Sequence, residues 1–549
     1  MNNKEIAKVF KLYAQLMELH GENPFRTKAI SSSVFKVEKI GVPILESTVK
    51  ELSDLPGIGK STAEKIHQIA HEGTFSELDE LLAKTPKGIL DLLEVKGLGP
   101  KKVLTIWKEM NITDLGELLY ACNENRLAQV KGFGVKTQAA VQDSIEFILK
   151  NKGWYLYAKI KAQAEHMLQL AQSAAETSDI ISFTGEFRRS SEILQRIEIL
   201  HTLPLIKLKL ALSEYNQDQV DSRTLRVGNH PDIPVDFINT TRENFARDLM
   251  LTTGSDSHVQ KLTSPLPSLP SEQEIYQSLG LSFIPPELRE GTHEVEKAKN
   301  NQIPNLITVS DLKGSLHNHS TYSDGKDTLK DMALYCRDNL KLEYFGIADH
   351  SPAAHYAGGL SIEKVQQQWE EIDLLNKELA PFKIFKGTES DILEDGSLDY
   401  PSEILAGFDY VVASIHRTLG MDEERATERL IKAIENPYTT ILGHPTGRLL
   451  LSRPGYPIDF KKVIDACKAN GVTIEINANP LRLDLDWRHH QYAIEQGVLL
   501  SINPDAHIKE GLLDMEYGVQ VARKGGLEAK GCLNAKTLDE ITQYFKNKK

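Results

Sequence analysis

Cysteine is scarce in this sequence: the 549 residues contain only Cys122, Cys336, Cys467 and Cys532, and no two of them form a CxxC pair. This spacing argues against a zinc ribbon and against a disulfide framework. Long apolar runs are also missing, since no stretch approaches the roughly 18 apolar residues of a membrane span. The first residues, 1–21, are amphipathic and charged, unlike a secretion signal. We therefore expect a protein of the reducing cytoplasm that neither crosses nor anchors to a membrane.

Positive charge is not in excess, because the net charge is −13. Such a balance ordinarily disfavours a nucleic-acid partner, since lysine and arginine drive phosphate binding. The excess of negative charge is unevenly spread, however. Residues 1–150 hold 20 Lys and Arg against 20 Asp and Glu, so residues 151–549 carry the whole net charge. An acidic C-terminal part suits a cluster of metal-binding carboxylates. The length exceeds the roughly 250–300 residues of one hydrophobic core, which predicts several domains.

One pattern occurs three times in the N-terminal part, at residues 52–66, 92–106 and 127–141: G-x-G, then basic residues, then a helical stretch. This is a helix-hairpin-helix signature. Glycine leaves backbone N–H groups at a helix start free to face a phosphate, and lysines neutralise its charge, so such a hairpin grips DNA without reading sequence. A tight helix-helix turn is the alternative, above all for the third copy. The candidate DNA-binding residues are Gly57, Gly59, Lys60, Lys65, Gly97, Gly99, Lys101, Lys102, Gly132, Gly134 and Lys136.

From residue 313 onward, short apolar strands alternate with helical stretches about every 30 residues, the length of a strand–helix unit. The strands are expected at 314–319, 344–350, 383–391, 410–416, 440–444, 472–477 and 499–507. Seven units predict a closed or distorted barrel, in which the carboxyl ends of the strands converge on one mouth. Metal-competent residues stand at or just after these ends: His317, His319, Asp324, His350, Glu389, His416, His444, Asp505 and His507.

These residue types indicate a metal site. His317 and His319 are two apart, so on a strand both point to one face. Any one histidine or acid of the set could instead be a hydrogen-bonded core residue or a helix cap, but a recurrence at successive strand ends favours ligands. Mixed imidazole and carboxylate donors suit manganese, zinc or iron better than magnesium, and we expect two or three divalent ions. Arg417 and Arg448 are candidate phosphate clamps or solvated surface arginines. Residues near the mouth that could orient the ligands, or simply cap loops, are Asp349, Asp391, Glu475 and Asn477.

Residues 1 to about 295 resemble the polymerase part of bacterial family X DNA polymerases, through GENPFR (21–26), LPGIGKSTAEKI (55–66) and IPPELREG (284–291). The resemblance implies that the hairpin domain holds a 5′-phosphate at a DNA gap. It also aligns Lys65 with the lysine that removes deoxyribose phosphate in some members. For Lys65 we favour a solvated helix lysine.

The palm of that family carries GSxRRGxExxGDIDIL, and this chain has GEFRRSSEILQRIEIL at 185–200. The positions of two catalytic aspartates therefore hold Arg196 and Glu198, and the third carboxylate remains as Asp236. Two-metal phosphoryl transfer needs carboxylates around ions about 3.5–4 Å apart, and an arginine repels such ions. The thumb also looks shortened, with LTSPLPSLPSE (262–272) as a Ser/Pro linker. We expect this part to hold DNA without adding nucleotides.

Residues 313–549 resemble the PHP domain of the same enzymes, through LHNHSTYSDG, ADHS, ASIH, GHPTGRLLL, EINANP and DAH. The resemblance implies a trinuclear site, with no departure from the family pattern at its nine positions. One ion would be held by His317, His319, Glu389 and Asp505, which are the candidate catalytic residues. Glu389 would bridge to a second ion on His416 and His444. The third would lie on Asp324, His350 and His507.

The sequence thus predicts a multidomain protein with a helical helix-hairpin-helix region, an α+β polymerase-like palm and a distorted α/β (β/α)7 PHP barrel. We expect a lyase-like DNA-binding domain at 1–85, a fingers-like domain at 86–150, a degenerate palm at 151–245, a shortened thumb and linker at 246–312, and a PHP phosphoesterase domain at 313–549. The favoured function is a metal-dependent 3′-5′ exonuclease acting on gapped or 3′-ended DNA in repair. A gap-filling polymerase and a small-molecule phosphatase are the alternatives.

Overall fold

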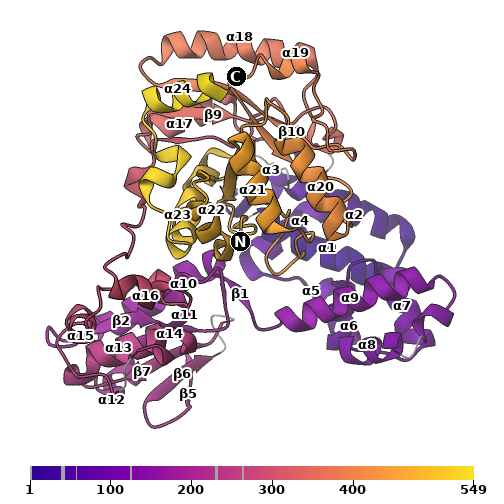
Figure 1. Ribbon diagram of the computed structural model, residues 1–549. Coiled ribbons are helices and arrows are strands. Elements are labelled where there is room, and N and C mark those ends of the chain that lie inside the picture. The colour runs from indigo at the N-terminus through magenta and orange to yellow at the C-terminus, as the bar shows by residue number, and fades with distance from the viewer. Residues whose placement is uncertain are drawn as a thin grey trace. The chain divides into compact units, whose positions relative to one another are not determined.

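The computed structural model describes residues 3–38, 44–56, 58–123, 126–228, 233–262 and 265–548 (Figure 1). The chain forms two compact units, residues 1–152 and 153–549. Among the described residues, no helix has both the length and the apolar character needed to cross a bilayer.

The first unit is helical. Its helices are α1 (Asn3–Leu19), α2 (Pro24–Glu38), α3 (Val49–Ser53), α4 (Lys60–Glu72), α5 (Ser76–Lys84), α6 (Lys87–Leu93), α7 (Pro100–Glu109), α8 (Leu115–Asn123) and α9 (Val135–Asn151). Their apolar faces share one core that includes Phe10, Ile66 and Ile106. Each G-x-G pattern precedes a helix, since Gly59, Gly99 and Gly134 are the N-caps of α4, α7 and α9. The predicted helix-hairpin-helix region is confirmed.

Two of the hairpin turns need glycine for its backbone freedom. Gly97 and Gly132 have φ of +89° and +94°, in the left-handed region that side chains disfavour. Gly57, which occupies the corresponding position in the first copy, lies outside the described residues.

The second unit begins with the palm. A five-stranded sheet has the order β2 (Ile181–Thr184), β4 (Ile197–His201), β7 (Val235–Asn239), β6 (Thr224–Gly228) and β5 (Asn216–Gln219). The short strands β1 (Tyr155–Leu156) and β3 (Ile193–Leu194) pair beside it. Helices α10 (Tyr157–Ser173) and α12 (Leu205–Ala211) pack on the sheet through Ala164, Met167 and Leu208. This is the α+β palm that the sequence predicts.

Four helices follow the palm: α13 (Phe245–Thr253), α14 (Asp256–Gln260), α15 (Glu272–Ser278) and α16 (Glu294–Lys299). The segment 265–271 between α14 and α15 has no regular secondary structure. Leu266 and Leu269 pack against a core that contains Met250, Ile275 and Tyr276. The expectation of a Ser/Pro linker stays a prediction, and Leu266 and Leu269 give the segment apolar contacts with that core.

The C-terminal part is a nearly closed barrel of seven parallel strands in sequence order: β8 (Gly314–Ser315), β9 (Tyr344–Ile347), β10 (Lys383–Asp391), β11 (Tyr410–Ser414), β12 (Ile441–Leu442), β13 (Thr473–Asn477) and β14 (Leu500–Asn503). The first and last strands approach beyond their ends, where Asn318 and Ala506 form a parallel bridge. His319 N–H also donates to the Ala506 carbonyl at 2.8 Å. The predicted seven-stranded barrel is confirmed.

The barrel interior is apolar below its mouth. Tyr410, the first residue of β11, donates to the carbonyls of Leu316 and Ile347 at 2.6 and 2.8 Å. Gly346 and Gly387 make room for that ring, since a Cβ at either would lie within 2.5 Å of it. Helix α24 (Leu538–Lys548) stacks Phe545 on Tyr410. Helices α17 (Leu329–Asp338) and α18 (Ile362–Glu378) cover β9 and β10 from outside (Figure 1).

Candidate metal centre

The nine predicted ligands converge at the mouth of the barrel, although they come from six strand ends. Three groups of side chains have ligand atoms within 4.8 Å of one another: His317, His319 and Asp505; His350, Glu389 and His416; and His319, Asp324, His350 and His507. His444 joins them through Nε2, which lies 3.0 Å from Glu389 Oε1. His319 and His350 belong to two groups each, so the groups form one continuous polar cluster.

The cluster is buried, and its deepest atoms lack partners. His317 and His319 are fully buried, and Glu389 is 1% exposed. Within the described residues, several ring nitrogens have no partner in hydrogen-bond geometry, although carboxylate oxygens of Asp505 and Glu389 lie 3.0 and 2.9 Å from two of them: His317 Nε2, both nitrogens of His319, His350 Nδ1 and His444 Nδ1. Leaving buried polar atoms unpaired costs free energy, roughly 1–3 kcal/mol per group. Convergent imidazole nitrogens beside carboxylates are the donor set of manganese, zinc or iron sites, so these residues fit divalent ions.

Two carboxylates fix the rings of ligand histidines from behind. Glu475 Oε1 lies 2.7 Å from His317 Nδ1, and Asp391 Oδ1 lies 2.5 Å from His416 Nδ1. Both contacts leave Nε2 facing the cluster. Asn477 donates to Glu475 and Asp505 at 3.3 and 3.1 Å. This arrangement sets tautomer and orientation, as outer partners do in metal sites.

Asp349 serves a different purpose from the histidine orientation considered for it. Its carboxylate accepts from Ser320 N–H at 2.9 Å, from Ser320 Oγ–H at 2.7 Å and from Gln368 at 2.7 Å. Asp349 therefore holds the loop after His319 in place, because donors from that loop and from Gln368 already occupy its carboxylate oxygens.

Charges within the cluster oppose the effect of burial. Burial alone would lower the pKa of His317, but the charges of Glu475 and Glu389 outweigh it and raise that pKa well above its ordinary value. Burial would raise the pKa of Glu389, yet His416 and His317 bring it well below its usual range. Burial lowers the pKa of His319 to about 3, and neighbouring histidines add to the effect. Without a bound cation, the carboxylates are thus ionised and His319 is neutral, whereas His317 holds a proton that a bound cation would displace.

The backbone is unusual at two of the strand ends. His444 and Asp505 have φ of +21° and +53°, a region that residues with a Cβ rarely adopt. Such conformations persist where surrounding contacts hold them, and they gather at functional sites. His444 is held by its own N–H, which donates to Glu475 Oε2 at 2.7 Å.

The two candidate phosphate clamps differ. Arg417 is exposed, with one long contact from Nη1 to the Ala353 carbonyl at 3.5 Å. Arg448 is fully engaged: its guanidinium pairs with Asp486 and donates to the carbonyls of Arg482 and Leu483. Arg448 therefore braces the 482–486 loop, and its donors are not free for a phosphate.

Arg482 is an arginine at the mouth that the sequence reasoning missed. Its Nε lies 3.7 Å from Asp505 Oδ2, and its side chain is 19% exposed. It follows the strand end at Asn477 by five residues, the only signal in the sequence that points to it.

Two arginines contact the remaining palm aspartate, Asp236. Arg226 donates from Nε and Nη2 to the two oxygens of Asp236, at 2.7 Å each, and Arg196 Nη1 lies 3.7 Å from the same carboxylate. Glu198 neighbours Asp236 on the adjacent strand, and burial raises the pKa of Glu198. Cations of the protein itself thus surround the surviving carboxylate.

Lys65 is not the solvated lysine that we favoured. It is 7% exposed, its ammonium pairs with Glu77, and it lies 5.1 Å from the centroid of Phe75. Lys60 and Lys101, by contrast, are exposed at the starts of α4 and α7. Lys102 donates to the Gly97 carbonyl at 3.0 Å, and Lys136 is exposed on α9.

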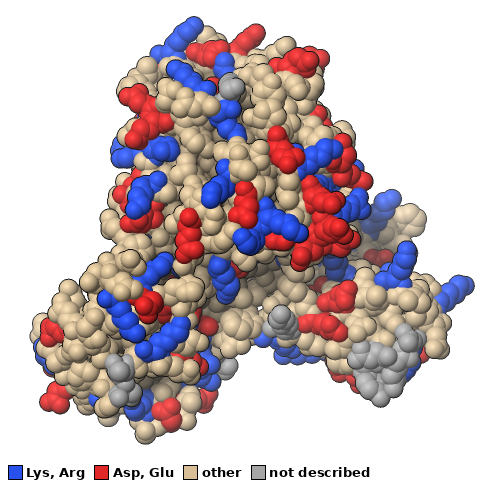
Figure 2. Space-filling model, in the orientation of Figure 1, with Lys and Arg blue, Asp and Glu red and all other residues tan. Residues whose placement is uncertain are grey.

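Acidic side chains gather over α20 (Glu423–Ile434) on the face of the barrel shown in Figure 2. Asp422, Glu423, Glu424 and Glu428 are all exposed there. Since these charges repel phosphate, the acidic patch over α20 is unsuited to a DNA backbone.

Comparison with protein families matches residues 1–75 to a helix-hairpin-helix domain, residues 89–146 to a SAM-like helix-hairpin-helix tandem and residues 315–479 to the PHP domain. Fold and site thus define a helix-hairpin-helix protein with a C-terminal PHP barrel. A Bacillus subtilis (strain 168) protein named DNA polymerase/3′-5′ exonuclease PolX is 34% identical over 581 residues, covering 100% of both chains. The chain belongs to this PolX family, the bacterial family X DNA polymerases with a PHP domain, which confirms the resemblance seen in the sequence.

Other relatives match part of the chain. A Thermoanaerobacter sp. (strain X514) protein named "Probable phosphatase" is 33% identical over 224 residues, covering 38% of this chain and 84% of that protein. An Acetivibrio thermocellus protein of the same name is 29% identical over 248 residues, covering 42% of this chain and 95% of that protein.

Proposed function

We propose that this protein is a metal-dependent 3′-5′ exonuclease that trims DNA 3′ ends in repair. The observation that carries the proposal is the convergence of nine imidazole and carboxylate side chains with unpartnered buried nitrogens. The relative named as a PolX polymerase and exonuclease, with its full coverage, supports this class of activity.

The chain's own residues would divide the work. His317, His319, Glu389 and Asp505 would hold one ion, Glu389 would also help His416 and His444 to hold a second, and a third would lie on Asp324, His350 and His507. Bound divalent ions lower the pKa of water and neutralise the oxygens of a phosphodiester. Glu475 and Asp391 keep His317 and His416 in the ligating tautomer. Arg482 would orient the scissile phosphate from the rim, with exposed Arg417 as a second candidate.

The helix-hairpin-helix unit would hold the DNA. Exposed lysines at the starts of α4 and α7 lie beside N-cap backbone, where helix N-termini favour phosphate. The predicted domain boundaries within the two units, at residues 85, 245 and 312, belong to the same proposal.

We infer further that the palm does not extend primers. Asp236 already has both oxygens bound by Arg226, and Arg196 stands where a first metal ligand is needed. Displacing a bidentate arginine in favour of a cation next to two guanidinium groups is electrostatically unfavourable.

A paired assay tests the proposal. The purified chain, with manganese added, is expected to shorten a 5′-labelled strand of gapped DNA and to leave a primer unextended when nucleotides are supplied. Absence of 3′-5′ degradation with any of manganese, zinc or iron would refute the exonuclease, and primer extension would refute the inactive palm.

A small-molecule phosphatase is the second candidate, favoured by the relatives named "Probable phosphatase". Comparing hydrolysis of nitrophenyl phosphate with that of single-stranded DNA separates the two. The hairpins favour DNA, since a phosphatase for small molecules has no use for them.

A further inference from the structure

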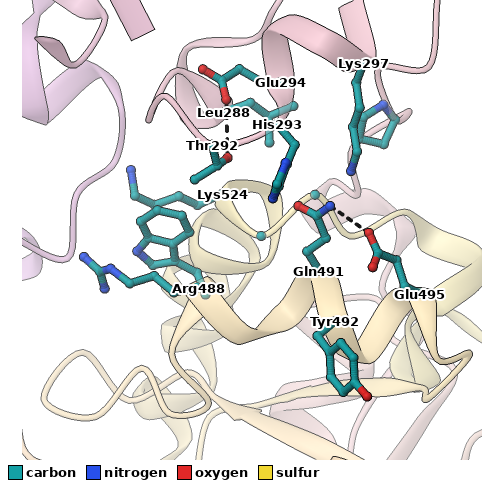
Figure 3. Close-up of a pocket in the computed structure, with 14 residues that line it drawn as sticks. Leu288, Thr292, His293, Glu294, Lys297, Arg488, Gln491, Tyr492, Glu495 and Lys524 are labelled. Atoms are coloured by element: carbon teal, nitrogen blue, oxygen red, sulfur yellow. Dashed lines mark hydrogen bonds between the residues drawn. The ribbon is translucent and has the colours of Figure 1, made fainter. Parts of the chain in front are cut away.

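A separate cavity of about 310 Å³ lies within the second unit, and none of the nine cluster residues lines it. One wall comes from the segment after the palm, with His293 and Lys297, and the other from the barrel, with Trp487, Gln491 and Glu495. In Figure 3, His293 and Lys297 point from their wall toward Gln491. Cavities that hold small ligands begin at roughly 300 Å³, so this one admits a compact molecule.

Most charges around the cavity are already neutralised. Lys524 pairs with Glu290, and Arg488 pairs with Glu192 and Asp486 at 3.2 and 3.0 Å. Glu294, also in the lining, is 2.6 Å from His258 Nδ1. Of these contacts, the pair of Lys524 and Glu290 joins the two walls of the cavity.

Among the described residues, two charged groups in the lining are left uncommitted. Within the described residues, the ammonium of half-buried Lys297 has no hydrogen-bond or ion-pair partner, and Glu495 accepts only from neutral Gln491, at 2.7 Å. The indole Nε1 of Trp487 is buried without an acceptor, in a side chain 8% exposed. The ring lies 4.6 and 5.0 Å from the cationic groups of Arg488 and Lys524, which fix its position. The indole nitrogen is closed to solvent, so Trp487 contributes its ring and not its N–H to the wall of the cavity.

We propose that this cavity binds a free nucleoside monophosphate. Its phosphate would pair with Lys297 and His293, and an amino group of its base would donate to Glu495. The choice of ligand rests on the proposed function in one respect: a 3′-5′ exonuclease releases nucleoside monophosphates. The binding site itself is independent of the metal cluster.

Calorimetric titration of the full chain with dAMP tests this, in the presence of a chelator so that metal-dependent binding at the cluster is suppressed. Lys297→Met is expected to weaken dAMP binding at least about tenfold, the effect of one charge-assisted hydrogen bond. Lys299→Met is the matched control, because Lys299 is on the same helix but outside the cavity, and it should change binding less than twofold.

The outcomes separate this proposal from the exonuclease. Lys297→Met should retain wild-type exonuclease activity, and His319→Ala should retain dAMP binding. dTMP, which lacks an amino group on its base, should bind several-fold more weakly than dAMP. The proposal is overturned if dAMP does not bind, if Lys297→Met binds it as the wild type does, or if inorganic phosphate binds as tightly as dAMP. A chain without exonuclease activity that still binds dAMP through Lys297 would refute only the proposed function.

Discussion

His317 Nδ1 and Glu475 Oε1 lie 2.7 Å apart, and both side chains are fully buried. Glu475 also accepts from Asn503 at 3.0 Å and from the His444 backbone at 2.7 Å. One carboxylate thus positions two of the proposed ligands and ties β13 and β14 to the ends of two other strands.

Glu475→Gln should therefore lower metal affinity and exonuclease activity by roughly 10- to 100-fold, the usual effect of removing an outer partner of a ligand histidine. The neutral amide is a weaker acceptor for His317. The measurement is activity against manganese concentration, where excess metal should restore part of the loss. Glu424→Gln, at an exposed position on α20, should match the wild type.

His319→Ala should reduce exonuclease activity by at least about 100-fold, because this side chain belongs to two of the three ligand groups. DNA affinity, measured by fluorescence anisotropy without added metal, should stay within twofold of the wild type. Undiminished degradation by this variant would show that the cluster is not the nuclease centre.

Asp236→Asn should destabilise the palm by about 1–3 kcal/mol, since it leaves Arg226 without its bidentate partner. Exonuclease activity should be unaffected. Thermal unfolding followed by circular dichroism and the gapped-DNA assay measure the two effects. A wild-type chain that incorporates nucleotides, and loses this with Asp236→Asn, would contradict the inactive palm.

Lys60→Ala and Lys101→Ala should weaken DNA binding and lower the slope of log K against log salt by about 0.9 for each phosphate that the variant no longer neutralises. Lys65→Ala is the informative comparison. Because its ammonium pairs with Glu77, its removal should reduce stability and leave the salt slope unchanged. Equal slopes for all three variants and the wild type would argue against the hairpins as the DNA-binding surface.

His201 should make the palm sensitive to acid. Burial lowers the pKa of this fully buried side chain to about 4, against about 6.5 in the unfolded chain. The unfolded state therefore binds the proton more tightly than the folded state. The contribution of neutral His201 to the free energy of unfolding is present above pH 6.5 and is lost as the pH falls toward 4, a loss of about 3 kcal/mol.

His201→Leu should flatten this dependence. The measurement is the difference in urea midpoint between wild type and variant at pH 7 and at pH 4.5, which should shift in favour of the variant at the lower pH. His166→Gln, at an exposed position, should follow the wild type at both pH values. A constant difference between wild type and His201→Leu would contradict the assignment.

The positions that the sequence predicted well share one property: strict periodicity along the chain. Each barrel strand is parallel to its neighbours, so the end of every strand falls on the same rim, and residues such as His416 and Asp505 meet there wherever the helices between them lie. The hairpins were equally readable, since Gly99 and Gly134 directly precede helices. Both patterns depend on residues close together in the chain, so they can be recognised in the sequence without knowing the tertiary structure.

The contacts decided by tertiary structure join segments far apart in the chain. Lys65 meets Glu77 of the following helix, Arg448 meets Asp486, and Arg482 reaches Asp505. Packing between helices and strands decides which charged side chains are buried and which are exposed. The repeating pattern of the sequence does not predict this outcome.

The sequence by itself determined the helix-hairpin-helix region, the seven-stranded barrel and the set of residues at its mouth, because alternation of strand and helix dictates where strand ends lie. Only the tertiary structure decided which arginine faces the cluster, that Arg226 closes on Asp236 across adjacent strands, and that Lys297, beside a cavity separate from the cluster, has no ion-pair partner among the described residues. Those outcomes depend on strand register and on the docking of the segment after the palm against the barrel, which bring together groups that the chain keeps apart.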